Sequence, residues 1–148
     1  MAFKGPYPTK FSGNTSAMVI SATTFSGGVT NAGTIGAGGI SVISGAFLSG
    51  GGILDTGTVV GGIKVDSSGK VVASGSTQTA IAVENTRTFG GGISNAGLIS
   101  AVHDGVLAGS VSTFSGGVRN QGTIVAGSRA VTVSNATVFT GGITNSGH

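Results

Sequence analysis

Three features of the sequence predict an all-β fold in which short parallel strands wind into stacked coils, a β-solenoid. One motif recurs along the whole chain, and runs of alternating β-branched residues lie between its copies. Gly accounts for 30 of the 148 residues, which is too dense for helices because each interior Gly costs about 1 kcal/mol relative to Ala. Strand elements repeated at a short interval are typical of coils that bury a common core by stacking.

Composition excludes several other classes of protein. A hydrophobic content of 39% and a mean hydropathy of +0.41 are too high for a disordered linker. The absence of Cys excludes a disulfide framework and a thiolate metal site. No two basic residues are adjacent, so we expect no nucleic-acid binding. No apolar run is long enough for a membrane helix or an export signal, so we expect this segment neither to insert into a membrane nor to direct its own export.

The recurring motif is Phe-x-Gly-Gly-Ile/Val-x-Asn-x-Gly-x-Ile. Three full copies and a shortened one begin at Phe25, Phe89, Phe114 and Phe139. A degenerate copy follows Phe47 and has Asp in place of Asn. Counted from residue 11, successive motif Phe residues are 14, 22, 42, 25 and 25 residues apart, and the longest interval divides if Val71 takes the Phe position. We therefore expect about six coils of roughly 18–25 residues each.

Strands are expected where apolar residues alternate with a period of two. In order along the chain, these segments are 17–20, 29–31, 40–43, 63–65, 81–83, 106–108 and 131–133. Gly-Gly pairs and Asn-x-Gly steps lie between them and supply the corners. Residues 1–10, which contain Pro6 and Pro8, are expected to form an N-terminal cap or extension, because Pro blunts a strand edge. Residues 11–148 are expected to form the solenoid, truncated in mid-repeat with an open C-terminal end.

Two series of residues recur at fixed positions of the motif. The first is expected to stack as one aromatic ladder inside the coil and comprises Phe11, Phe25, Phe47, Phe89, Phe114 and Phe139. The second comprises Asn31, Asp55, Asn95, Asn120 and Asn145. Its members either form corners, since Asn and Asp bond their own backbone and Gly accepts a positive φ, or form an amide ladder between coils. We favour the corner interpretation, and neither interpretation is a binding site.

The repeated motif, with Val-x-Val strands between its copies, resembles the passenger domains of bacterial autotransporters from about Phe11 to Gly147. This resemblance implies a right-handed, single-stranded parallel β-helix that is secreted or held at the bacterial cell surface. It also implies a rigid stalk or an adhesin module that contacts host glycans or surface proteins. We interpret the chain as a piece of a longer passenger.

Few side chains are available for catalysis. The chain has four acids, whereas glycoside cleavage takes two carboxylates about 5–9.5 Å apart. His103 and Asp104 are the one catalytic-looking pair, but neighbours in an extended segment point to opposite faces. We therefore predict no catalytic, cofactor-binding or metal-binding residues and no cofactor. The alternatives are self-assembly by end-to-end stacking through open coil ends and, less favoured, a polysaccharide-acting enzyme.

Overall fold

A computed structural model describes residues 2–3, 9–21 and 24–148, and all regular secondary structure in these ranges is β. The predicted all-β solenoid is confirmed, and it has about five turns. The segment with Pro6 and Pro8, expected to cap the N-terminal end, lies outside the described residues. Within the described ranges, no helix has the length and apolar character needed to span a bilayer.

The strands from β3 to β6 span eight to ten residues, and those that follow span two to four. The chain begins with β1 (Ala2–Phe3), β2 (Thr9–Phe11), β3 (Asn14–Ser21), β4 (Thr24–Asn31), β5 (Thr34–Ile43) and β6 (Phe47–Asp55). It continues with β7 (Thr58–Val59), β8 (Ile63–Val65), β9 (Lys70–Ala73), β10 (Ile81–Glu84), β11 (Thr88–Phe89), β12 (Ile93–Asn95) and β13 (Leu98–Ala101). It ends with β14 (Val106–Gly109), β15 (Thr113–Phe114), β16 (Val118–Asn120), β17 (Thr123–Ala126), β18 (Val131–Ser134), β19 (Val138–Phe139) and β20 (Ile143–Asn145).

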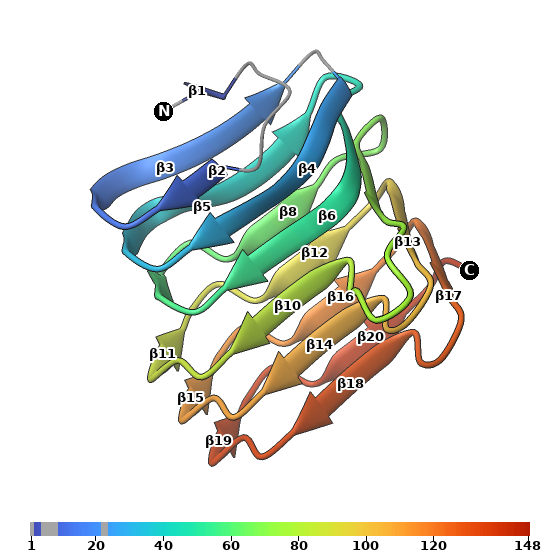
Figure 1. Cartoon of the computed structure of the whole chain (residues 1–148). Coiled ribbons are helices and arrows are strands. Elements are labelled where there is room, and N and C mark those ends of the chain that lie inside the picture. The colour runs from blue at the N-terminus through green and yellow to red at the C-terminus, as the bar shows by residue number, and fades with distance from the viewer. Residues whose placement is uncertain (1, 4–8, 22–23) are drawn as a thin grey trace.

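The strands form two parallel sheets that enclose the core, one in front of the other in Figure 1. Sheet 1 has the order β19-β15-β11-β7-β5-β8-β12-β16-β20, and β3 also pairs with β5. Sheet 2 has the order β17-β13-β9-β6-β10-β14-β18, and β4 also pairs with β6. The chain alternates between the sheets, so each turn of the coil adds one level to both. Later turns have two short strands in place of one long strand, because β5 pairs with both β7 and β8 and β6 pairs with both β9 and β10.

Inward-facing residues lie above one another from turn to turn. In sheet 1, Ile40 pairs with Ile63, Ile63 with Ile93, Ile93 with Val118 and Val118 with Ile143, so these turns span 23, 30, 25 and 25 residues. The last two turns therefore keep the 25-residue interval of the motif. The turn from Ile63 to Ile93 is longer than the sequence predicts, because it also contains the extended segment between β9 and β10.

Gly residues allow the coils to approach closely at the bend between two short strands. Gly117, between β15 and β16, has a φ of 68°, a conformation that residues with a Cβ rarely adopt. A Cβ at this position would also collide with the backbone carbonyl oxygen of Gly142 in the next turn. The Gly-Gly step after each Phe of sheet 1 is therefore a requirement of stacking as well as of the bend.

The core lies between the sheets and follows from the period-two pattern. Ile63 and Val65 of β8 are buried, whereas Lys64 between them is exposed. Ile81 and Val83 of β10 are also fully buried. Burial of each Val or Ile side chain contributes about 1.5–3 kcal/mol relative to exposure. The alternation therefore decides which face of each short strand points into the coil.

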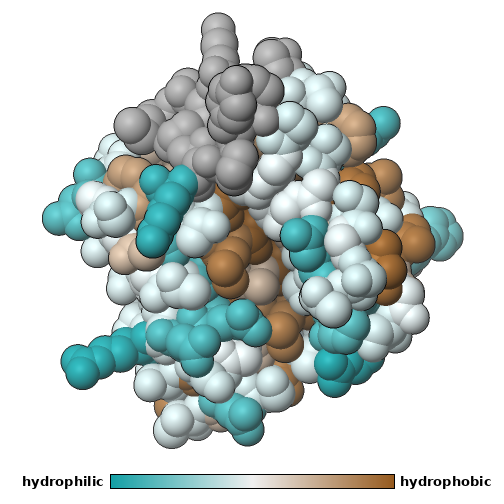
Figure 2. Space-filling view, viewed as in Figure 1, coloured by the Kyte–Doolittle hydropathy of each residue, from teal (hydrophilic) through white to brown (hydrophobic). Residues whose placement is uncertain are grey.

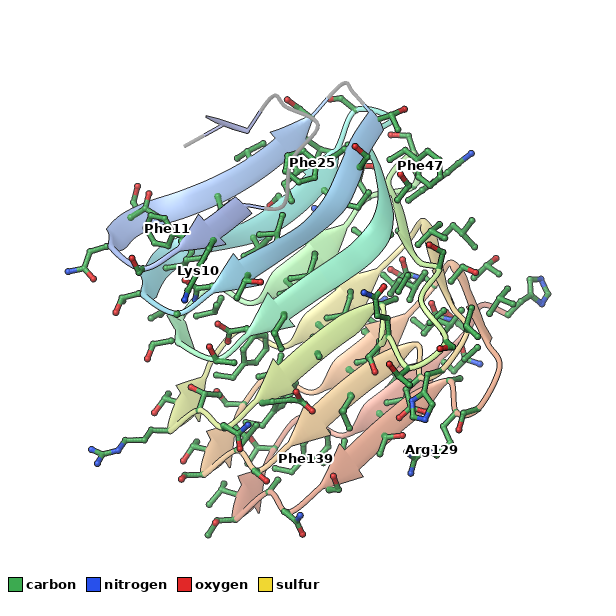
Figure 3. All side chains as sticks on the ribbon, viewed as in Figure 1. Lys10, Phe11, Phe25, Phe47, Arg129 and Phe139 are labelled. Atoms are coloured by element: carbon green, nitrogen blue, oxygen red, sulfur yellow. The ribbon has the colours of Figure 1, made fainter. Side chains whose placement is uncertain are left out.

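The single aromatic ladder predicted from six Phe residues is wrong. Phe89, Phe114 and Phe139 stack in sheet 1, with ring centroids 4.8 Å apart for the first pair and 5.3 Å for the second. Phe25 lies in sheet 2 instead, where its position in the next turn is occupied by Leu48. Figure 3 shows Phe25 and Phe139 towards opposite ends of the coil.

The two remaining Phe residues also lie outside the stack. Phe11 is in β2, in register with Asn31 and partly buried against the core. Phe47 is in register with Lys70 on the outer side of β6, as Figure 3 also shows. The physical reason is that each turn contains two half-turns of similar pattern, one in each sheet. The motif copies fit either sheet, so self-similarity along the sequence does not reveal which sheet a copy joins.

Candidate functional site

The Asn residues of sheet 1 connect consecutive turns. Asn95 donates from Nδ2 to Oδ1 of Asn120 at 2.8 Å, and Asn120 donates in the same way to Asn145 at 2.7 Å. Oδ1 of Asn95 also accepts from the backbone N–H of Gly97 at 3.1 Å. We call Asn95, Asn120 and Asn145 the amide ladder. Its residues form corner contacts and inter-turn contacts together, so the two interpretations of the sequence describe one arrangement.

Asn31 and Asp55 form a second, shorter column in sheet 2. Oδ1 of Asp55 accepts from Nδ2 of Asn31 at 2.7 Å and from the backbone N–H of Gly57 at 3.1 Å. Val83 occupies the same position in the next turn, and Oδ2 of Asp55 is buried with no hydrogen-bond partner among the described residues. Burial raises the pKa of Asp55, and the hydrogen bonds from Asn31 and Gly57 only partly oppose this effect.

Asp66 closes the turn between β8 and β9. Its Oδ1 accepts from the backbone N–H groups of Ser68 at 3.0 Å and Gly69 at 2.8 Å, and its Oδ2 accepts from that of Ser44 in the preceding turn at 3.2 Å. Against desolvation, which raises it, the hydrogen bonds from these groups lower the pKa of Asp66. The carboxylate is therefore a corner group, as turn chemistry predicts.

Asp104 is buried between β13 and β14 and pairs with Arg129 in the next turn. Arg129 donates from Nη2 to Oδ2 at 2.9 Å and from Nε to Oδ1 at 3.2 Å. Nδ1 of His103 lies 3.6 Å from Oδ1 of Asp104, beyond hydrogen-bond distance. Against desolvation, which raises it, the hydrogen bond and charge of Arg129 and the charge of His103 lower the pKa of Asp104. The sequence analysis missed Arg129, although its 25-residue separation from Asp104 matches the repeat.

A groove of about 490 Å³ lies on the outer face of sheet 2. Its floor contains Leu54, Ala82 and Leu107, which occupy the same register position in three consecutive turns. Residues 77–79 and His103 form one wall, and Glu84 lies at the far end of β10. We call this the outer groove. Figure 2 shows a hydrophobic strip running down the middle of this face between more polar ridges.

The C-terminal end of the coil leaves part of the core uncovered. Ile143 is 52% exposed and Val138 is 43% exposed. A hollow of about 200 Å³ at this end is lined by Val118, Ile124 and Val131 together with Ile143 and its neighbours. Nδ2 of Asn145, the last group of the amide ladder, has no acceptor among the described residues.

Comparisons with known proteins add no family assignment to this geometry. Protein-family models, curated proteins and solved structures were all searched, and none matches the chain. Within the described residues, His, Asp and Glu side chains do not gather in threes or more as potential metal ligands. The structure therefore offers a scaffold with an outer groove and an uncovered end as its candidate functional features.

Proposed function

We propose that the chain is a non-catalytic scaffold, a segment of an autotransporter-type passenger that serves as a rigid stalk or adhesin module. The observation that carries this proposal is the use of buried polar side chains to join neighbouring turns. Asn31, Asn95 and Asn120 donate to side chains one turn away, and Asp104 accepts from Arg129 one turn away. Secretion or display at a bacterial surface is proposed from the resemblance of the motif alone.

The distribution of acids supports a non-catalytic role over polysaccharide cleavage. Asp55, Asp66 and Asp104 are engaged in the hydrogen bonds of corners and inter-turn contacts. Glu84 is the one acid among the residues that line the outer groove. Glycoside cleavage takes a pair of carboxyl groups across the scissile bond, and the described groove supplies a single one.

Binding and cleavage assays on the purified chain test this function. We expect binding to host cells or to glycan arrays above the level of an unfolded Phe114→Asp control, with no release of reducing ends from bacterial or host polysaccharides. Phe114 is buried in the core, so an Asp there places an unpaired charge among apolar groups. Release of reducing ends by the wild-type chain would contradict the non-catalytic role, and binding no better than the control would remove the adhesin role.

End-to-end self-association is a second candidate function, favoured by the C-terminal end. Unpaired strand edges with exposed apolar residues are ready to pair with another chain, and Val138 and Ile143 provide such residues. Light scattering over a concentration series should then detect oligomers of the wild type. Ile143→Lys should abolish them, whereas Val60→Lys, at a 51% exposed Val on the side of the coil, should not. A monomer at every concentration would refute this role.

A further inference from the structure

The floor of the outer groove departs from the polar character of its own register position. Leu54, Ala82 and Leu107 point outwards in consecutive turns, whereas the same position carries Thr30 in the turn before and Thr132 in the turn after. Outward Thr residues are therefore compatible with this strand geometry. The apolar strip is a local property of three turns, with the small Ala82 forming a notch between two Leu residues.

The wall of the groove is built by an insertion in one turn. Ile53 and Ile81 are in register 28 residues apart, whereas Ile81 and Val106 are 25 apart. The segment between β9 and β10 turns back on itself, because Gln78 donates its backbone N–H to the carbonyl of Gly75 at 3.0 Å and accepts from the N–H of Gly75 at 3.3 Å. This turn places polar side chains at residues 77–79 beside the apolar floor.

The groove carries one charge that the protein leaves unpaired. Glu84 has no ion-pair or hydrogen-bond partner in the described ranges. Its Oε1 lies beside the side chain of Leu107, since both would come within 3.8 Å of a Cβ added at Gly109. A carboxylate next to an apolar strip matches a ligand that combines an aliphatic group with a positive charge.

We propose that the outer groove binds an extended peptide segment that carries aliphatic side chains and a Lys or Arg. Aliphatic side chains pack on Leu54, Leu107 and the notch at Ala82, and the basic group pairs with Glu84. The hydroxyl and amide groups of residues 77–79 face the peptide backbone. No aromatic side chain lines the groove to stack on a sugar ring, which favours a peptide over a glycan. The inference deepens the proposed binding role and rests on it.

NMR titration of the isotope-labelled chain tests the inference with defined probes. The first probe is an acetylated and amidated hexapeptide of Ser, two Leu and one Lys; the others replace Lys with norleucine or Glu, replace both Leu with Ser, or are a maltohexaose. We expect methyl shifts at Leu54 and Leu107 with the Lys peptide. Glu84→Gln should weaken binding of that peptide about three-fold, the size of a partly exposed ion pair, and leave the norleucine peptide unchanged.

A variant inside the groove and one outside it complete the design. Leu107→Thr, which the Thr at neighbouring register positions makes compatible with the fold, should weaken every Leu peptide at least about five-fold. Val125→Thr, at an exposed Val elsewhere on sheet 2, should change nothing. Equal binding of the Lys and Glu peptides, binding unaffected by Leu107→Thr, or binding of maltohexaose alone would overturn the inference. If Leu107→Thr keeps full cell adhesion, the groove inference fails while the adhesin role survives.

Discussion

Replacing Asp55 with Asn should stabilise the protein at neutral pH. Asp55 is fully buried, and its Oδ2 has no partner among the described residues. An Asn at this position keeps Oδ1 as the acceptor for Asn31. Its Nδ2 gains the carbonyl of Gly57, because Asn31 and Asn95 donate to the Gly two residues later at 3.3 Å. Relief of a buried, unsatisfied polar atom contributes about 1–3 kcal/mol.

The pH dependence gives this prediction a sign. The folded state raises the pKa of Asp55 above its ordinary value of 3.8, so folding binds the proton more tightly. The contribution of Asp55 to stability is therefore present at low pH and is lost as the pH rises towards the folded-state pKa. Asp66 and Asp104 have lowered pKa values and act in the opposite direction, so the informative quantity is the difference between variant and wild type.

Urea denaturation of both proteins at a series of pH values measures this difference. The stability advantage of Asp55→Asn should be small near pH 4 and should increase as the pH rises to neutrality and above. Each kcal/mol corresponds to about 2–4 °C in melting temperature for a chain of this size. A variant less stable than the wild type at neutral pH, or a difference that does not change with pH, would refute the reasoning.

Three further substitutions test the packing of the coil by the same urea denaturation. Asn120→Ala removes two hydrogen bonds of the amide ladder and should lower the free energy of unfolding by about 2–3 kcal/mol, whereas Gln121→Ala on the surface should change it by about 0.5 kcal/mol or less; equal effects would contradict the ladder. Phe114→Ala empties the middle of the aromatic stack and should cost about 3–5 kcal/mol; a loss below about 1 kcal/mol would contradict it. Gly117 and Gly142 both have a φ of 68°, but an added Cβ meets a neighbouring turn only at Gly117. Gly117→Ala should therefore cost at least about 1 kcal/mol more than Gly142→Ala, and equal losses would show that close stacking is not what requires Gly.

Local pattern was sufficient to predict the strands and the parallel stacking. The alternation at Ile63–Val65 and Ile81–Val83 matches the buried and exposed positions of β8 and β10, because side-chain direction in a strand depends on local geometry alone. The 25-residue interval likewise matches the stacking of Phe89 on Phe114. These features required no knowledge of which segments meet in space.

Assignment to one sheet or the other could not be predicted in this way. Phe25 and Phe89 begin nearly identical motif copies, yet Phe25 lies in β4 of sheet 2 and Phe89 in β11 of sheet 1. The outer groove was missed for a related reason. Leu54, Ala82 and Leu107 are unremarked positions within predicted strands, and only the register of three turns and the insertion at residues 74–80 bring them together.

The stacking of turns through buried amides is the central claim, and side-chain amide NMR tests it most directly. The Nδ2 protons of Asn95 and Asn120 should show a nuclear Overhauser effect to one another and should exchange slowly with solvent, because their side chains are buried and hydrogen-bonded at 2.8 Å. The amide of exposed Gln121 should exchange rapidly in the same spectrum. Rapid exchange at Asn95 and Asn120 with no such effect between them would contradict the claim.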